Sequence, residues 1–216
     1  MATYLSLVNK VLVLLREDEV TSVGDTEYST LIGRFVNLIK EEMEDSADWE
    51  VLRTTIQVAT VADTWRYALT DATNRAKILD VFNDSQNMWM YEKNGKWMTA
   101  QLNTAPVTRN SPMWYNINGV DSNEDLQVDI YPVPTGVEYL NFNMIVPEAE
   151  LSADTDTTSM PTRALTLGAW AMAISERGED GGANYNETYG KYMSALADGI
   201  SLDASHHSYE LIMEPV

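Results

Sequence analysis

The order of hydrophobic periods along the chain constrains its fold more than any other feature. Near both ends apolar residues recur every three to four positions, and in the middle they alternate with polar residues. The first pattern is typical of amphipathic helices and the second of half-buried strands. The sequence therefore predicts an α+β fold, in which a four-helix bundle built from the N- and C-terminal parts carries an inserted antiparallel β-domain.

The expected boundaries follow the changes of period. Residues 1–50 and 160–202 are predicted to form the helical bundle, residues 51–159 the inserted β-domain and residues 203–216 a C-terminal tail. The four helices are expected over Tyr4–Arg16, from Asp25 onward, from Pro161 onward and over Asn184–Leu202. Thr3 is a candidate N-cap of the first helix, because its hydroxyl can accept a hydrogen bond from the first turn.

Two of these helices have distinctive compositions. The helix that begins near Pro161 is apolar nearly all round, which predicts burial, and its small residues allow neighbouring helices to approach closely. The second helix gathers acidic residues toward its C-terminal end, where the helix dipole disfavours them, so we expect a nearby cation or an exposed end. These residues are Glu41, Glu42, Glu44, Asp45 and Asp48.

The middle of the chain predicts short strands joined by turns. Asn94-Gly95, between Met88–Glu92 and Lys96–Met98, is a strong hairpin signal, although the residues from Trp97 to Leu102 fit a short helix equally well. The segments Leu126–Ile130 and Val137–Val146 flank a Pro- and Gly-containing turn. We therefore expect these two segments to pair as antiparallel strands.

Charge and composition exclude several classes of function. The chain has 33 acidic and 14 basic residues, a formal net charge of −19, which opposes tight binding of nucleic acid or anionic lipid through a basic patch. It has no cysteine, so disulfides and thiolate metal ligands are absent. The N-terminus lacks the basic region of a signal peptide, and no apolar run approaches the roughly 20 residues that span a bilayer. We expect a protein made in a cytoplasm, with no membrane contact.

The candidate chemical sites are weak. His206 and His207 are adjacent and fit a solvated tail better than one metal site. The segment from Asp121 begins like a calcium loop, but Leu126 and Pro132 stand where that loop needs Gly and Glu. Glu176, with the acids that follow it, fits a solvated helix corner better than a catalytic pair. No catalytic motif occurs, so we predict no enzyme, cofactor or metal.

Two groups of apolar residues are candidate binding surfaces. The first is aromatic and lies in the β-region, where flat rings can stack on sugars or form cross-strand and subunit contacts. Its members are Trp89, Tyr91, Trp97 and Trp114, with Tyr115 beside them. The second is the apolar tail, which is expected to dock on its own domain or on a partner. Its members are Tyr209, Leu211, Ile212 and Met213.

Several stretches in this order resemble bacteriophage head-to-tail adaptors, most nearly the tail tubular protein A type of short-tailed phages. They are VNKVLVLLRED, IGRFVNLIKEEMEDSADW, the VDIYPVPTG turn, MPTRALTLGAWAMAISERGEDGG and YGKYMSALADGI. The resemblance covers roughly Tyr4 to Leu202 and lies in element order and composition, without an invariant catalytic string.

The resemblance implies a structural virion protein that is made in the host cytoplasm. It implies a homo-oligomer, a dodecameric ring beneath the portal that contacts the tail nozzle and continues the DNA channel, through which DNA is ejected without specific binding. The tail residues from Tyr209 would then bind the portal, and Trp89, Tyr91, Trp97 and Trp114 would contact the nozzle or neighbouring subunits. The alternative from the residues alone is a soluble carbohydrate- or protein-binding module that uses the β-domain aromatics.

Overall fold

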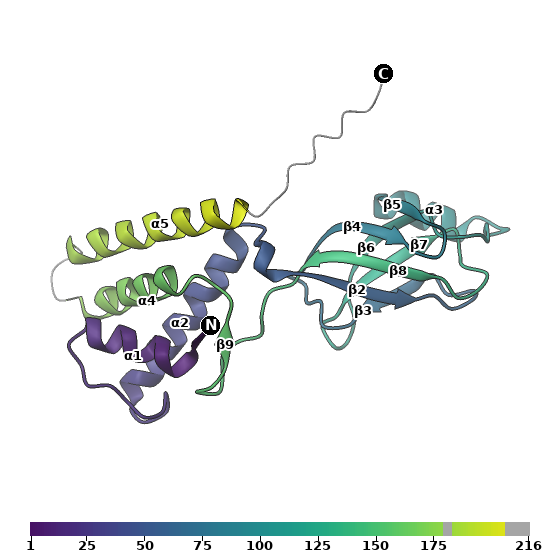
Figure 1. Ribbon diagram of the computed structural model, residues 1–216. Coiled ribbons are helices and arrows are strands. Elements are labelled where there is room, and N and C mark those ends of the chain that lie inside the picture. The colour runs from purple at the N-terminus through teal and green to yellow at the C-terminus, as the bar shows by residue number, and fades with distance from the viewer. Residues whose placement is uncertain (179–182, 206–216) are drawn as a thin grey trace, which may run out of the picture. The chain divides into compact units, whose positions relative to one another are not determined.

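The computed structural model describes residues 1–178 and 183–205 (Figure 1). The chain divides into two compact units, a helical unit of Met1–Leu52 with Glu148–Val216 and a sheet unit of Arg53–Pro147. Among the described residues, no helix combines the length and hydropathy needed to cross a bilayer.

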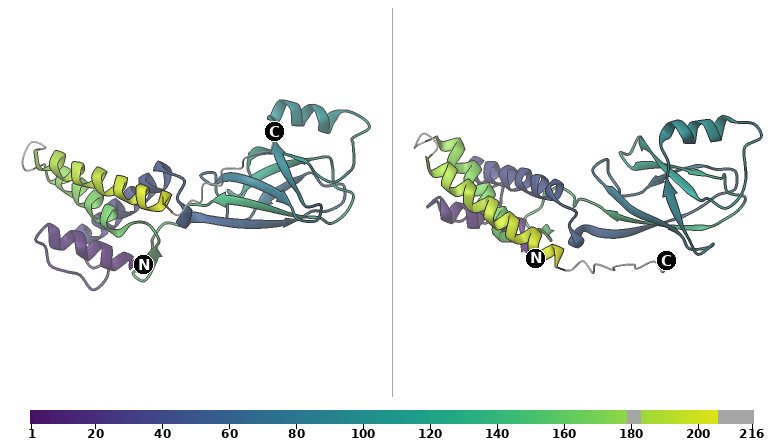
Figure 2. Two further views of the ribbon diagram at one scale, coloured as in Figure 1. Left: turned by 45° about the horizontal axis from the view of Figure 1, so that its top comes forward. Right: turned by 90° about the horizontal axis from the view of Figure 1, so that it is seen from above.

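The helical unit contains four α-helices, a 3₁₀ turn and a two-stranded ribbon, and the helices pack side by side (Figures 1 and 2). The helices are α1 (Tyr4–Leu14), α2 (Glu27–Ser46), α4 (Thr162–Arg177) and α5 (Ala183–Ala204), and a 3₁₀ turn, η1 (Glu50–Leu52), follows α2. Strand β1 (Ala2–Thr3) pairs with β9 (Thr157–Thr158) in an antiparallel ribbon. This ribbon joins the N-terminus to the segment that leads into α4.

The sheet unit is a single seven-stranded sheet with one helix. Its strands are β2 (Arg53–Ala59), β3 (Arg66–Leu69), β4 (Lys77–Asn83), β5 (Met88–Glu92), β6 (Trp114–Val120), β7 (Leu126–Tyr131) and β8 (Tyr139–Ile145), and its helix is α3 (Gly95–Asn103). The spatial order is β2-β8-β4-β5-β6-β7-β3, and the two edge strands, β2 and β3, contact each other. The sheet therefore curves nearly into a barrel.

Side-chain caps fix the starts of the first two helices. The Thr3 hydroxyl accepts a hydrogen bond from Ser6 N, which confirms the predicted cap of α1. Thr26 and Ser29 form a reciprocal capping box at the start of α2. These caps satisfy backbone N–H groups that the first helical turn leaves without partners.

Small residues bring α4 against α2, as its composition predicts. Gly168 faces Ile39 so closely that an added Cβ would lie 2.7 Å from the Ile39 Cγ2 atom. Most of the buried residues of α4 are alanines, and Leu165 is the large exception. Trp170 stays partly exposed, so α4 is buried on one face and not all round.

The sheet unit has its own hydrophobic core. Inward-facing residues of β4, β7 and β8 fill it, among them Val81, Ile130 and Phe142, each with 0% of its surface exposed. The Tyr115 ring meets the Phe142 ring edge-on at 6.4 Å between centroids. Alternation along each strand sends the remaining side chains to the outer face of the sheet.

The predicted fold class is wrong. The described residues hold five α-helices, not four, and the large near-barrel sheet supplies a core that is mostly sheet. The sheet is also mixed, because β5 and β6 run parallel. Hydrophobic period indicates individual strands, although it placed one over Lys96–Met98, which lies in α3. It carries no information on whether seven short strands close on one another into a principal core.

Two local predictions are corrected as well. Asn94-Gly95 does not make a hairpin: Asn94 is the N-cap of α3, its side chain accepting from Trp97 N at 2.8 Å, and the short-helix alternative is confirmed. The expected pairing of Leu126–Ile130 with Val137–Val146 is wrong too. β7 lies between β6 and β3, whereas β8 lies between β2 and β4, because the turn between them crosses the sheet.

Candidate functional site

The outer face of β5 presents the most exposed aromatic side chains of the sheet unit. Trp89 and Tyr91 are 53% and 62% exposed, and Met90 between them is buried, as strand alternation requires. Phe82 on the neighbouring strand supports Trp89 edge-on, at 4.9 Å between ring centroids. These two exposed rings are suited to binding a partner, because each offers a large apolar surface at a small entropic cost.

Trp97 and Trp114, the other two predicted contact residues, form a cluster of their own. The Trp97 ring on α3 meets the Trp114 ring at 5.3 Å and the Tyr131 ring at 5.6 Å, both edge-on. Trp114 and Tyr131 stack, and Lys93 lies 5.6 Å from the centre of the Trp97 ring. This cluster holds α3 on the sheet, so Trp97 and Trp114 chiefly support the surface that Trp89 and Tyr91 expose.

Polar side chains continue this outer face across β8 and β2. Gln57 donates to Asn141 at 2.9 Å, and Thr55 donates to Asn143 at 2.6 Å. Asn143 in turn donates to the Asp80 carboxylate on β4. Aromatic rings thus adjoin rows of amide and hydroxyl groups on one face of the sheet.

Sequence reasoning missed a second apolar surface at one end of the sheet, which we call the tip. It consists of Val61, Trp65, Val137 and Tyr139, all exposed. Thr60 and Gly136, whose loops carry Val61 and Val137, are joined by a 2.8 Å hydrogen bond, so the two loops lie together. The sequence did contain a signal for this surface. Val61 and Val137 stand directly beside turn residues, where the alternation of a buried strand does not explain an apolar side chain.

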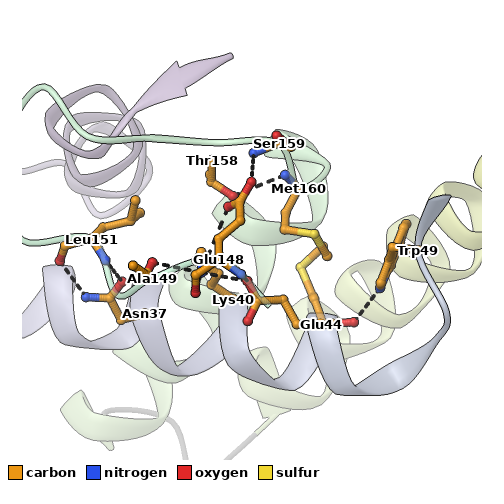
Figure 3. A network of polar contacts seen from close by, with 11 residues as sticks. Asn37, Lys40, Glu44, Trp49, Glu148, Ala149, Leu151, Thr158, Ser159 and Met160 are labelled. Atoms are coloured by element: carbon orange, nitrogen blue, oxygen red, sulfur yellow. Dashed lines mark hydrogen bonds and ion pairs between the residues drawn. The ribbon is translucent and has the colours of Figure 1, made fainter. Parts of the chain in front are cut away.

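A buried polar network in the helical unit fixes the segment that leads back from the sheet unit (Figure 3). The Lys40 ammonium, whose side chain is 3% exposed, donates to Glu44 Oε1 at 2.6 Å and to the carbonyl of Glu148 at 2.9 Å. The Glu148 carboxylate accepts from Ser159 N at 2.8 Å. Lys40 is thus one cation near the acidic end of α2, where the sequence led us to expect one.

The remaining acidic residues of the helical unit are mostly exposed. Glu41, Glu42 and Asp45 face solvent on α2, and Asp48 is exposed just after the helix ends at Ser46. Glu42 also accepts a hydrogen bond from the Tyr192 hydroxyl at 3.1 Å, and burial together with this carboxylate raises the pKa of Tyr192. The result is an acidic surface along the second half of α2.

Charge is divided unequally between the two units. The helical unit has 23 acidic and 7 basic residues, a net charge of −16, and the sheet unit has 10 acidic and 7 basic residues, a net charge of −3. The helical unit therefore carries most of the chain's negative charge.

The remaining candidate sites are the Asp121 segment, the two histidines and the C-terminal tail. The Asp121 carboxylate accepts from the backbone N–H groups of Asn123 and Asp125, which makes an acidic hairpin turn. Within residues 1–178 and 183–205, no group of three or more metal-binding side chains occurs. The tail residues Tyr209, Leu211, Ile212 and Met213 lie outside the described residues, as do His206 and His207.

Comparison with known protein families decides the class of protein. A family model described as SU10 adaptor protein matches residues 2–209, nearly the whole chain. The chain belongs to the SU10 adaptor protein family. It is therefore a phage structural adaptor protein, a virion component of the head-tail junction that associates with other virion components such as the portal and the tail. None of the curated proteins matches the chain.

The family and the geometry are consistent with each other. An adaptor needs surfaces for partner proteins. The sheet unit exposes two apolar surfaces, the aromatic face of Trp89 and Tyr91 and the tip. Family membership also points to a structural and non-enzymatic role.

Proposed function

We propose that this SU10-family adaptor assembles as a ring between the portal and the tail nozzle, and that the ring continues the DNA channel. The observation that carries the proposal is the charge imbalance: the helical unit has 23 acidic and 7 basic residues. In a ring this charge repeats in every subunit. Acidic side chains that face the channel repel the DNA phosphates, so the duplex slides through without being bound.

The acidic face of α2 is our candidate for the channel lining. Glu41, Glu42 and Asp45 are exposed on it, and Asp48 is exposed just beyond its C-terminal end. Repetition around a symmetry axis concentrates their field in the channel, where low-dielectric walls strengthen it. We propose twelve copies per ring and a relationship to the tail tubular protein A type, as the resemblance implies, with synthesis in the host cytoplasm.

We propose different partners for the two candidate binding surfaces. Trp89 and Tyr91, supported by Trp97 and Trp114, are proposed to contact the nozzle or a neighbouring subunit, since exposed Trp and Tyr are enriched among residues that dominate binding energy. The segment with Tyr209, Leu211, Ile212 and Met213 is proposed to bind the portal.

Negative-stain imaging with mass measurement tests the ring. The purified chain is mixed with portal protein, and closed rings that sit on the portal and contain many copies of the chain are expected. Deleting Ser208–Val216 should spare folding and weaken portal docking. A monomer that ignores the portal at every concentration tested would refute the proposal.

A carbohydrate-binding module is a second candidate, favoured by one observation. The exposed rings of Trp89 and Tyr91 lie on the same face of the sheet as the amides of Gln57 and Asn141, with Phe82 of β4 between Trp89 and Asn141. Sugars bind to surfaces that combine flat rings and hydrogen-bonding groups. Titration with soluble oligosaccharides separates the candidates. Saturable glycan binding that Trp89→Ala abolishes would support the module, and its absence at millimolar sugar would remove it.

A further inference from the structure

A groove in the helical unit is not explained by any function proposed above. It lies where the end of α1, one face of α4 and the first turns of α5 meet, and its volume is about 560 Å³. Leu14, Trp170 and Ile174 supply apolar surface to it, and Leu14 is 41% exposed. Apolar surface in an open groove of this size is typical of a binding site for a peptide or another ligand.

The groove also gathers basic residues in a strongly acidic unit, together with one acidic residue, Glu187. Three of the seven basic residues of the helical unit line it, namely Arg16, Arg177 and Lys191. Arg177 is paired with Glu17, and Lys191 with Glu187 at 2.7 Å. Arg16 has no ion pair among the interactions of the described residues, so it is available to an incoming carboxylate.

These features select an acidic, apolar peptide as the occupant. The chain contains one segment of that composition outside the described residues, at positions 206–216. It has the apolar residues Tyr209, Leu211, Ile212 and Met213 and the acidic residues Glu210 and Glu214, and it contains no lysine or arginine.

The segment is long enough to reach the groove. α5 ends at Ala204, and Lys191 lies 13 residues earlier, a distance of about 20 Å along the helix. An extended chain advances about 3.3 Å per residue, so roughly six residues cover this distance. The residues that follow, from about Leu211 onward, can then lie in the groove.

We propose that the groove binds the chain's own C-terminal segment, residues 206–216, when no other protein holds it. The tether makes binding intramolecular, with an effective concentration on the order of millimolar, so even a weak contact is well populated. Docking also covers apolar residues that would otherwise promote aggregation. In the proposed adaptor function the same segment binds the portal, and docking in the groove would then compete with portal binding.

Because the chain has no cysteine, a disulfide between two introduced cysteines reports on that pair alone. Met213→Cys is combined with Leu14→Cys in the groove, and in the control with Leu38→Cys on α2. Leu38 is a suitable control because it is the same residue type, 50% exposed against 41% for Leu14, and does not line the groove. Both variants are oxidised with copper phenanthroline at low protein concentration, and the products are separated by non-reducing electrophoresis after circular dichroism confirms folding.

The Leu14→Cys pair should form an intramolecular disulfide at least about tenfold faster than the Leu38→Cys pair, because docking raises the local concentration. Adding Arg16→Glu and Lys191→Glu should slow it toward the control rate. Equal rates for the two pairs would overturn the proposal, and so would products that are mainly covalent dimers, which would show that the groove receives the segment of a second copy. No portal is present in this assay, so its result is independent of whether the ring forms.

Discussion

The two units of this adaptor differ most in where they put charge and where they put apolar surface. The helical unit has a net charge of −16, whereas the sheet unit has a net charge of −3 and exposes the aromatic face and the tip. A strongly charged surface repels polyanions and resists association, and exposed aromatic rings favour protein contact. Negative charge and exposed aromatic surface are thus separated between the two units of one chain.

The units also differ in how they pack. The helical unit relies on small residues, such as Gly168 against Ile39, and on the buried network around Lys40. The sheet unit fills its core with large side chains such as Phe142. Substitutions should therefore destabilise the two units for different physical reasons.

The largest effect is expected from removing a large side chain from the sheet core. Phe142→Ala leaves a cavity and should lower the free energy of unfolding of the sheet unit by about 3–5 kcal/mol. Trp89→Ala is the matched control, since Trp89 is an exposed aromatic and its loss should change stability little. Denaturant unfolding followed by tryptophan fluorescence and circular dichroism measures both. Equal destabilisation by the two substitutions would break the distinction between core and surface in this unit.

The next largest effect tests the buried network of the helical unit. Lys40→Met leaves the Glu44 carboxylate buried without its cation and should cost about 3 kcal/mol of unfolding free energy. The double variant Lys40→Met with Glu44→Met removes both charges and should recover much of this loss. Thermal unfolding of the single and double variants provides the comparison. A double variant as unstable as the single one would show that the loss does not come from an uncompensated charge.

A smaller effect distinguishes two glycines of the helical unit. Gly168→Ala forces a methyl group against Ile39 and should destabilise by about 1–3 kcal/mol. Gly190→Ala in α5 has open space around the added atom and should stabilise by about 0.5–1 kcal/mol through helix propensity. Opposite shifts in melting temperature are expected. Shifts of the same sign would mean that close approach of α2 and α4 is not what Gly168 provides.

The smallest effect concerns an acidic turn of the helical unit. The backbone N–H groups of Ala153 and Ser152 hydrogen-bond the Asp156 carboxylate and lower its pKa. A lowered pKa in the folded state means that this carboxylate stabilises the fold above the unfolded value of about 3.9, and that the contribution is lost as the pH falls through the lowered pKa.

Asp156→Asn should therefore lower the melting temperature slightly at pH 7 and leave it unchanged once the pH is below the lowered pKa. Thermal scans of both proteins across this pH range measure the difference. A difference that persists unchanged in acid would show that the charge of Asp156 has no part in holding the turn.

The sequence predicted local structure better than topology. Helical period and capping chemistry located α1, α2 and α5, because these depend on residues close in the chain. Closure of the sheet and the separation of β7 from β8 depend on contacts between distant residues, which no local pattern encodes. Asn94-Gly95 shows the limit well, since the same Asn side chain that favours a turn also caps a helix.

The candidate surfaces were likewise easier to predict where they depend on residues close in the chain than where distant segments meet. Trp89 and Tyr91 were predicted as contact residues and are exposed, while Trp97 and Trp114 turned out to pack with Tyr131 across elements that meet only in the fold. The tip and the groove were not predicted. Each is assembled from separate segments of the chain.

Electron cryomicroscopy of the head-tail junction in the intact virion tests the proposed roles of the two units most directly. We predict a ring of this chain in which the acidic face of α2 lines the DNA channel and the aromatic face of the sheet unit contacts a neighbouring protein. A ring whose sheet unit lines the channel while the acidic helices lie outside, or a junction without a ring of this chain, would contradict the account.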